Sequence, residues 1–572
     1  MQAIKLINKD FPGETSKPSL ALLINAACTK LFVKQPCIFR VPEHLRRLNE
    51  NAYTPFHVSI GPFHHRDDKY SVMEEHKLVY ARDLIRRRFW GSKTSNVSDQ
   101  KGKVTTLEEE IKVYVEEVEK LEVEARKSYA ESIKLSKEEF VDMLLIDGCF
   151  IVEFLCRKIR KLSYLEIEME STSKELGETT RACESTKVGG TFNGMYKFIE
   201  EVYEDWEPAN DFIFQSTRTS FEVRRDLTLL ENQLPYFVLE HIFEFTFSKA
   251  IEEFLKNQVF SSEDVPKFHD IVYCALRTSI PNTTHVLTRE DVDLRTKNPE
   301  MTAHFVSFLR MCCLPPQIIS GKVKKAEQSG VFTSDERHNT KTAKKITADQ
   351  VQDEESTSSG AKQEQRINIK HMREFPCLCN METPHDIRVP SVTRLAKAGV
   401  LFEKSCSETP LLEIKFDSKR GVLKMPPLTM WHHTETFFRN VMAHELYNHT
   451  ANSGSRSVSD YMCFMDDLIN SKEDVALLVK SKIIQNWLES DAVVADLFNS
   501  ITKHILADYS SYSDTCMQLN KFRGKYNIRW LKAILQQEYF SQPWAIVYFI
   551  TLVVIQTAAA TIQAVTTFTS KK

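Results

Sequence analysis

The segment from His444 to His449, which also contains Glu445, is the part of this sequence closest to a catalytic metal motif. A zinc-protease helix carries two histidines four residues apart, so that both imidazoles face one metal ion. Here the fourth position after His444 is Asn448, and His449 is rotated by about 140° around a helix relative to His444. The spacing excludes a metalloprotease of this type.

A second group of histidines, His57, His64, His65 and His76, contains residues that could ligate a metal. None of them is paired with a cysteine, and we interpret them as loop and surface histidines. The chain also has no G-x-S-x-G elbow, no glycine-rich phosphate loop and no Rossmann fingerprint, and it has only 16 glycines. We therefore assign no catalytic, cofactor-binding or metal residue and expect no cofactor.

Two polar islands interrupt apolar runs. One centres on Asp147 within residues 143–155, and the other is Glu231-Asn232-Gln233. A buried carboxylate can act as a general acid or base. More often it accepts hydrogen bonds that hold a loop or a helix end, and Pro235 indicates an interrupted helix at the second island. We favour the structural interpretation for both.

The first part of the chain has helical periodicity. Three sequences have the form of a capping box, in which a hydroxyl and a carboxylate satisfy free backbone N–H groups: Ser71 to Glu74, Thr106 to Glu109 and Ser136 to Glu139. After the second box an apolar stripe follows at steps of four and three residues: Leu107, Ile111, Tyr114, Val118, Leu121 and Ala125. We interpret it as helices packed within one body, although a coiled coil shares this pattern.

The later part of the chain begins with a β pattern. Leu412, Ile414 and Phe416 alternate with charged residues, and turn residues 417–421 lead to a second strand, Val422–Met425. A helix is expected over Thr434–Tyr447. Another follows a capping box at Ser471, with these apolar positions: Val475, Leu478, Ile483 and Ile484.

Charge and cysteine content give weaker information. The 572 residues have a net charge of −3, which favours no nucleic-acid partner, and we expect Arg86-Arg87-Arg88 to form a solvated helix face. The 13 cysteines show no framework spacing and fit a reducing compartment.

Gly321–Gln365 is rich in Lys, Glu, Ser, Thr, Asp and Gln and has few large apolar residues. Such a segment buries too little surface to offset its ordering entropy, so we predict a disordered insertion. The expected fold class is mainly α, with a helical body, a small β-hairpin and a transmembrane helix. The predicted parts are residues 1–35, 36–320, 321–368 (the insertion), 369–542, 543–568 (the membrane helix) and 569–572.

Tyr539–Ser570 is a run of 32 residues without a charged side chain or a histidine. As a helix, Trp544–Phe568 would be about 37 Å long, enough to cross the ~30 Å core of a bilayer. A buried helix of a globular domain is the alternative. No signal-peptide pattern is present near Met1, and basic residues precede the run, so we expect a C-terminal anchor with a cytosolic body.

Four residues of the predicted span lie on one helix face: Gln556, Ala560, Gln563 and Thr567. In lipid, glutamine amides find no partner among acyl chains, so this face could pair with a second membrane helix. The alternative is that these residues are merely tolerated in the anchor, and both interpretations stay open.

Several motifs resemble those of one plant family in type and order. They are Ile38-Phe39-Arg40-Val41-Pro42, Tyr53-Thr54-Pro55-Phe56-His57, Ser59-Ile60-Gly61-Pro62-Phe63-His64-His65, Met73-Glu74-Glu75-His76-Lys77, Asp147-Gly148-Cys149-Phe150, Asp226 to Pro235, Phe438 to Glu445, and Pro543-Trp544. Together they resemble the plant-specific domain-of-unknown-function 247 family, also called UPF 0481, over residues 36–568. Relatives usually have Phe-Glu-Gln where this chain has His444-Glu445-Leu446.

The resemblance implies a single-pass membrane protein, mostly helical and without established enzyme activity. Some grass relatives are implicated in self-incompatibility. Our leading hypothesis is a membrane-anchored interaction or recognition protein at the plasma membrane, with the bilayer and an unknown protein as partners. A structural scaffold at the membrane cannot be separated from it. The alternative is an enzyme whose pocket is formed by His57, His64, His65, Asp147, Glu231 and Asn232.

Overall fold

The computed structural model describes residues 36–88, 106–176, 192–257, 265–282, 285–297, 302–316, 388–406, 408–447, 456–505, 511–523, 550–552 and 554–562. Contacts group residues 1–321 and 386–572 into one compact unit and residues 322–385 into another. The second unit and the predicted insertion 321–368 lie outside the described residues.

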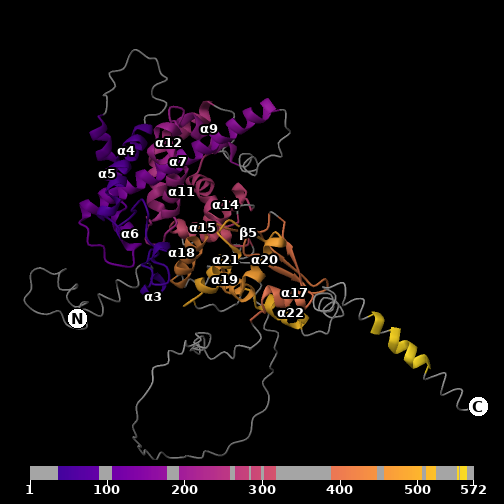
Figure 1. Cartoon of the computed structure of the whole chain (residues 1–572). Coiled ribbons are helices and arrows are strands. Elements are labelled where there is room, and N and C mark those ends of the chain that lie inside the picture. Colours follow the sequence, from indigo (N-terminus) through magenta and orange to yellow (C-terminus); the bar gives the residue numbers. More distant parts are fainter. Residues whose placement is uncertain are drawn as a thin grey trace, which may run out of the picture. The chain divides into compact units, whose positions relative to one another are not determined.

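Helices dominate the amino-terminal part of the first unit (Figure 1). They are α3 (Glu43–Arg46), η1 (Glu50–Ala52), η2 (Asp68–Tyr70), α4 (Ser71–Arg87), α5 (Leu107–Glu119), α6 (Glu122–Lys127), α7 (Lys137–Leu176), α9 (Asn193–Val202), η3 (Pro208–Asn210), α10 (Phe212–Gln215), α11 (Thr217–Asp226), α12 (Tyr236–Asn257), α13 (Phe268–Leu276), η5 (Arg277–Ser279), α14 (Arg289–Thr296) and α15 (Phe305–Cys313).

The carboxyl-terminal part mixes helices with short strands. They are α17 (Val392–Lys397), β1 (Leu401–Lys404), β2 (Lys415–Asp417), β3 (Val422–Met425), β4 (Leu428–Met430), α18 (Thr434–Tyr447), α19 (Ser457–Leu468), α20 (Lys472–Lys480), β5 (Ile484–Asn486), α21 (Asp491–Ile501) and α22 (Ser513–Arg523). The mainly α class is confirmed, and so is the predicted helix over Thr434–Tyr447.

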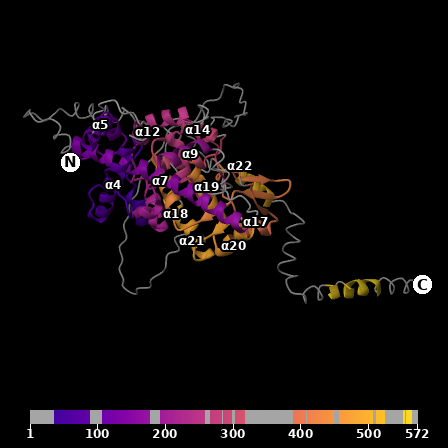
Figure 2. The same ribbon diagram turned by 90° about the horizontal axis from the view of Figure 1, so that it is seen from above.

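The 40-residue helix α7 organises the amino-terminal part. It begins after a capping box in which the Glu139 N–H donates to Ser136 Oγ and the Ser136 N–H donates to the Glu139 carboxylate. Helices α4, α5, α9, α12 and α13 pack along it (Figures 1 and 2). Gly148 permits the approach of α12, because a Cβ there would lie 2.4 Å from Ile242 Cδ1. A larger residue at this point would therefore require the end of the Ile242 side chain to shift.

The capping predictions have mixed outcomes. The boxes at Thr106, Ser136 and Ser471 are confirmed. The box at Ser71 is wrong, because η2 runs directly into α4 and leaves no side-chain cap. The predicted stripe after Thr106 is divided between α5 and α6, and its first members, Leu107 and Ile111, are exposed.

The predicted β-hairpin is present but belongs to a larger arrangement. Strands β2 and β3 pair antiparallel as expected, with Gly421 at a φ of +68° in the turn. The predicted first strand is too long, because β2 begins at Lys415 and leaves Leu412 and Ile414 before it. β1 adds to β3 in parallel, and β4 pairs in parallel with β5 in a second sheet. The expected continuation of the Ser471 helix to Ile484 is wrong, since α20 ends at Lys480 and Ile484 begins β5.

The expectation of a solvated face at Arg86-Arg87-Arg88 is wrong for two of its residues. The Arg87 guanidinium lies 3.6 Å from the centre of the Tyr203 ring and donates to Val202 O at 2.8 Å. Arg88 lies over Phe245 and pairs with Glu110 at 2.9 Å. A planar guanidinium can stack on a ring and pair with a carboxylate at once, so these arginines pack α4 against its neighbours.

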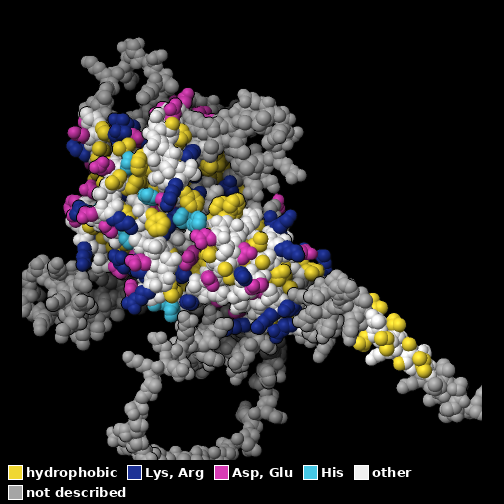
Figure 3. Space-filling model, viewed as in Figure 1, with side chains coloured by type: hydrophobic (Ala, Val, Ile, Leu, Met, Phe, Trp, Pro, Cys, Tyr) yellow, Lys and Arg dark blue, Asp and Glu magenta, His cyan; other side chains and the backbone are white. Residues whose placement is uncertain are grey.

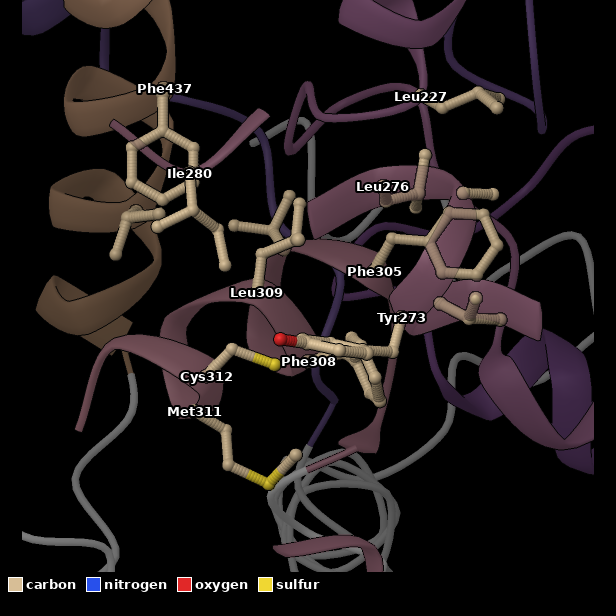
Figure 4. Close-up of a cluster of buried hydrophobic side chains, with 14 of the residues drawn as sticks. Leu227, Tyr273, Leu276, Ile280, Phe305, Phe308, Leu309, Met311, Cys312 and Phe437 are labelled. Carbon is tan, nitrogen blue, oxygen red and sulfur yellow. The ribbon is translucent and has the colours of Figure 1, made fainter. Parts of the chain in front are cut away.

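Both parts of the chain contribute to one apolar core in the first unit. Figure 4 shows Phe437 of α18 beside Ile280, with Leu309 and Phe305 of α15 nearby. Residues far apart in sequence therefore share one buried cluster.

Residues 550–552 and 554–562 are helical, with exposed and mostly apolar side chains and no charged ones (Figure 3). Over the part of the chain that the structure describes, no helix combines the length and apolar character needed to cross a bilayer. The rest of the predicted span 543–568 lies outside that part, including Gln563 and Thr567.

Candidate functional site

The Asp226 carboxylate holds an irregular segment of backbone, residues 54–62, which we call the anchored loop. Asp226 stands at the end of α11, is fully buried, and accepts hydrogen bonds from the N–H groups of Phe56, His57 and Val58 at 2.7–3.1 Å. Arg225 pairs with the same carboxylate at 2.9 Å. Burial raises the pKa of Asp226, while Arg225 and the three N–H groups oppose that shift.

Asn232 and Asp147 hold the next residues of the anchored loop. Asn232 Oδ1 accepts from the Ile60 N–H at 2.7 Å, and its amide donates to Val58 O at 3.0 Å. Asp147 Oδ2 accepts from the Gly61 N–H at 2.8 Å, and Oδ1 pairs with the buried Lys77 ammonium at 2.7 Å. Burial lowers the Lys77 pKa, but Asp147 and Glu74 outweigh it, so the net shift is upward and Lys77 stays charged.

Glu231 holds the segment that precedes the loop. Its Oε1 accepts from the Val41 N–H at 2.6 Å and pairs with Arg46. The His64 ring approaches its other oxygen at 3.8 Å. Burial and then Arg40 lower the pKa of His64 to about 4, so this imidazole is neutral near pH 7.

The six residues of the hypothetical enzyme pocket lie on or around one loop, and none of them lines the cavity beside Tyr273 or the cavity beside Arg224. Asp147, Glu231 and Asn232 bind backbone groups, as the structural interpretation predicts. His57 pairs with Glu222, and burial lowers the pKa of His65. Asp147, Glu231 and Asn232 therefore position backbone, whereas His57 and His64 lie against the carboxylates of Glu222 and Glu231.

The predicted histidine group does not gather into a metal site. His76 stacks on Phe212 at 4.3 Å between ring centres, while His57 and His64 face different carboxylates. A different group, His269, Asp270 and Asp293, has ligand atoms within 4.8 Å of one another. Two cations already pair with those carboxylates: Arg289 with Asp270 at 2.8 Å and Lys267 with Asp293 at 2.7 Å. The group is accounted for as an ion-pair network.

A cavity of about 220 Å³ lies between α11, η5 and the start of α18. Its lining combines aromatic, aliphatic, hydroxyl and cationic side chains: Phe221, Arg224, Arg225, Thr228, Thr278, Ser279, Ile280, Pro281, Trp431, His433, Thr434 and Phe437. Residues from three separate stretches of sequence meet here. Convergent polar groups within apolar walls are typical of small-molecule sites, so this cavity is the candidate site.

Aromatic residues form one side of this cavity. The Trp431 ring stacks on Trp487 at 5.4 Å with an angle of 5° between the planes, and the two are 41% and 63% exposed. The His433 ring lies 4.6 Å from that of Phe221. Burial and then Arg225 lower the pKa of His433 to about 4, so His433 is neutral near pH 7. These aromatic residues are not recognisable as a site from the sequence, because they lie in distant parts of the chain and follow no common motif or spacing.

His444, the residue at the zinc-protease-like segment, is buried against His304 instead of facing a metal. The two rings meet edge to face at 4.8 Å, and His304 Nε2 bonds Cys37 O at 3.0 Å. Neither His444 nitrogen has a partner among the described residues, and burial lowers its pKa well below 6.5. The neighbouring Glu445 pairs with Arg310 at 2.7 Å and accepts from the Ser459 N–H at 2.8 Å. His444 is therefore a buried core residue, and Glu445 links α18 to α15 and α19.

Comparisons with known proteins cover most of the chain. The model of the DUF247 family, described as plant protein of unknown function, matches residues 38–557. The Arabidopsis thaliana putative UPF0481 protein At3g02645 is 23% identical, over 91% of this chain and 88% of that protein. The Arabidopsis thaliana UPF0481 protein At3g47200 is 24% identical, over 92% and 86%. No solved structure matches.

Asp147→Asn should lower the free energy of unfolding by about 1–3 kcal/mol, because the buried Lys77 charge loses its anionic partner. Thermal and urea unfolding of the purified protein measure this change. Asp142→Asn, at an exposed position of the same helix, is the matched control and should change stability by less than about 0.5 kcal/mol. Equal midpoints for Asp147→Asn and wild type would contradict the structural role.

His444→Phe should raise the free energy of unfolding by about 1 kcal/mol, because two buried nitrogens without partners are removed and the ring contact with His304 is kept. The unfolded chain protonates His444 near pH 6.5, whereas the folded chain does so only at lower pH. Stability of the wild type therefore falls as the pH decreases below 6.5, and the variant should lose less. Thermal midpoints at pH 7 and pH 5 test both effects, and a larger loss in the variant would contradict them.

Proposed function

The chain belongs to the DUF247 family of plant proteins of unknown function, and we propose that it is a membrane-anchored interaction or recognition protein that binds a partner without catalysing a reaction. The observation that carries the proposal is the stacked pair Trp431–Trp487. Tryptophan is enriched among the residues that dominate binding energy, and two exposed, parallel rings offer a rigid apolar surface.

The pair is rigidly placed, which suits recognition. Trp431 directly follows β4 and Trp487 directly follows β5. The backbone N–H of Trp487 donates to Met430 O at 3.0 Å. The sheet therefore fixes both backbones before any partner arrives, so binding needs little further ordering. Fixed anchors of this kind lower the entropic cost of association.

The buried carboxylates support a binding role over chemistry of their own. Asp226 and Asp147 are both engaged with backbone N–H groups and with a cation. A general base has to be within reach of a substrate proton, whereas these oxygens already accept hydrogen bonds from the anchored loop. The role that these contacts support for the two carboxylates is to hold the backbone of the anchored loop.

We further propose that residues 543–568 hold the protein in a membrane, with the body on the cytosolic side. The support is the run Tyr539–Ser570, in which 32 residues carry no charged side chain, and the mostly apolar helical residues 550–552 and 554–562. The plasma membrane is the proposed location, and recognition between cells or signalling is the proposed setting. Self-association along the Gln556 and Ala560 face belongs to the same proposal.

Deleting Pro543–Lys572 should move the protein from the membrane fraction to the soluble fraction, because the run that partitions into lipid is then absent. Fractionation of plant cells that express both forms, with high-salt and carbonate washes, measures this. Full-length protein should resist both washes. A truncated form that still resists carbonate extraction would contradict an anchor at 543–568.

The double variant Trp431→Ala, Trp487→Ala should lose partners. Full-length protein fused to a biotin ligase is expressed in plant cells, and labelled proteins are quantified by mass spectrometry. Loss of two central aromatic anchors weakens binding by about tenfold or more, so specific labelling should fall accordingly. Phe212→Ala removes an exposed aromatic ring elsewhere, 51% exposed, and should leave the labelled set unchanged. Equal loss in both variants, or in neither, would contradict a role of the tryptophan pair.

A further inference from the structure

Arg224 is a buried cation without an anionic partner at the wall of the 220 Å³ cavity. Its side chain belongs to a residue that is 7% exposed, and the structure gives it one hydrogen bond, to the Thr278 hydroxyl. Its guanidinium also lies 4.7 Å from the centre of the Phe221 ring. Among the described residues no carboxylate pairs with Arg224.

This isolation is unusual for an arginine. The neighbouring Arg225 pairs with Asp226, and the nearby Glu222 is engaged by Arg218 at 2.8 Å and by His57. Burial alone lowers the pKa of Arg224 to about 10, which still leaves it protonated near pH 7. A buried charge without a counterion costs stability, so its presence calls for a ligand or another compensation.

The surroundings of Arg224 add positive charge. Lys161 lies near Lys158 and donates to Phe214 O at 2.8 Å. Burial, then Arg224 and Lys161, lower the pKa of Lys158 to about 7. Arg224 and Lys161 thus both disfavour a positive charge on Lys158. An anion bound at Arg224 would reduce this repulsion on Lys158.

Much of the remaining cavity wall is apolar. Ile280 and Phe437 lie beside each other in Figure 4, and Phe221, Pro281 and Trp431 complete the same lining. A bare inorganic anion would leave these walls against water or empty space. A ligand with an apolar ring would fill them and exclude that water.

We propose that this cavity binds a small organic acid, with a carboxylate paired to the Arg224 guanidinium and an aromatic or alicyclic ring between Phe221, Ile280 and Phe437. A planar guanidinium matches a carboxylate with two parallel N–H donors. The volume of about 220 Å³ is below the ~300–1,000 Å³ of drug-sized pockets, so the ligand is a compact acid.

The site has a physical connection to the exposed tryptophans, because Trp431 both lines the cavity and stacks on Trp487. A ligand in the cavity therefore contacts the base of the surface proposed for recognition. The ligand proposal does not depend on that function, however, and its test requires no protein partner and no membrane attachment.

The test uses the full-length protein in lipid nanodiscs, with benzoate and 2-naphthoate as probes and their neutral amides as controls for partition into lipid. At about a hundredfold excess over Kd, at least one carboxylate should raise the thermal midpoint by about 3 °C, and calorimetry should detect its binding. The matched amide should bind at least about tenfold more weakly, because it lacks the charge that pairs with Arg224. Sodium sulfate should give no comparable shift.

Arg224→Met is the decisive variant. It should melt at the same or a higher temperature than wild type without probe, since an uncompensated buried charge is removed, and it should bind the carboxylate at least about tenfold more weakly. Arg218→Met changes an exposed arginine of the same helix, 85% exposed at its side chain, and should bind like wild type. Ile280→Ala tests the apolar wall and should weaken binding of 2-naphthoate, the larger ring, more than binding of benzoate.

The outcomes separate the alternatives. Absence of any carboxylate-specific shift in wild type overturns the proposal, and so does unchanged binding by Arg224→Met. If sulfate raises the thermal midpoint as much as the carboxylates do, the apolar walls do not contribute to binding, and the proposal of an organic acid is overturned in favour of an inorganic anion site. If Arg224→Met fails to fold, Arg224 is structural and the proposal fails, unless Ile280→Ala retains its fold and selectively loses 2-naphthoate.

Discussion

The N–H groups of residues 56–61 have to be satisfied inside the protein without a helix or a strand, and the rest of the body is arranged around that requirement. Asp226 accepts three of these N–H groups, Asn232 accepts one, and Asp147 accepts another. A buried N–H without a partner costs about 1–3 kcal/mol, so these side chains decide whether this segment can be buried. Gly61 completes the arrangement, because its φ of +71° and its approach to Gln233 O leave no room for a Cβ.

Hydrogen bonds between polar side chains and backbone groups also join the two parts of the chain. Asn440 of α18 accepts from the Leu230 N–H at 2.9 Å and donates to Ala52 O at 2.7 Å. Glu445, one turn further along α18, receives Arg310 from α15. The amide and carboxylate thus act as backbone partners between segments that are more than 100 residues apart in sequence. This explains why the two parts share one apolar core and why α18 can form a wall of the cavity.

The buried cations among the described residues are of two kinds, those with an anionic partner and those without one. Lys77, Arg225 and Arg310 are buried but paired, so burial and Coulomb attraction offset each other. Arg224 is buried and has no such partner among the described residues. The unpaired Arg224 and the paired Arg225 are neighbours in α11, so burial in a low dielectric does not by itself explain why only one of them has an anionic partner. Arg224 and Arg225 both line the cavity, but Arg225 is paired with Asp226, so Arg224 is the one whose charge a bound anion would balance, which is the basis of the organic-acid proposal.

The sequence alone determined the features that depend on neighbouring residues. The capping boxes at Thr106 and Ser136, the turn at Gly421 and the helix Thr434–Tyr447 follow from local hydrogen bonding and periodicity, and the structure confirms them. The same chain order of motifs indicated the family. Tertiary structure alone decided the parallel pairing of β4 with β5, the stacking of Arg87 on Tyr203 and the convergence of Arg224 and Phe437 on one cavity. These depend on contacts between residues tens to hundreds of positions apart, for which local propensity and spacing carry no information.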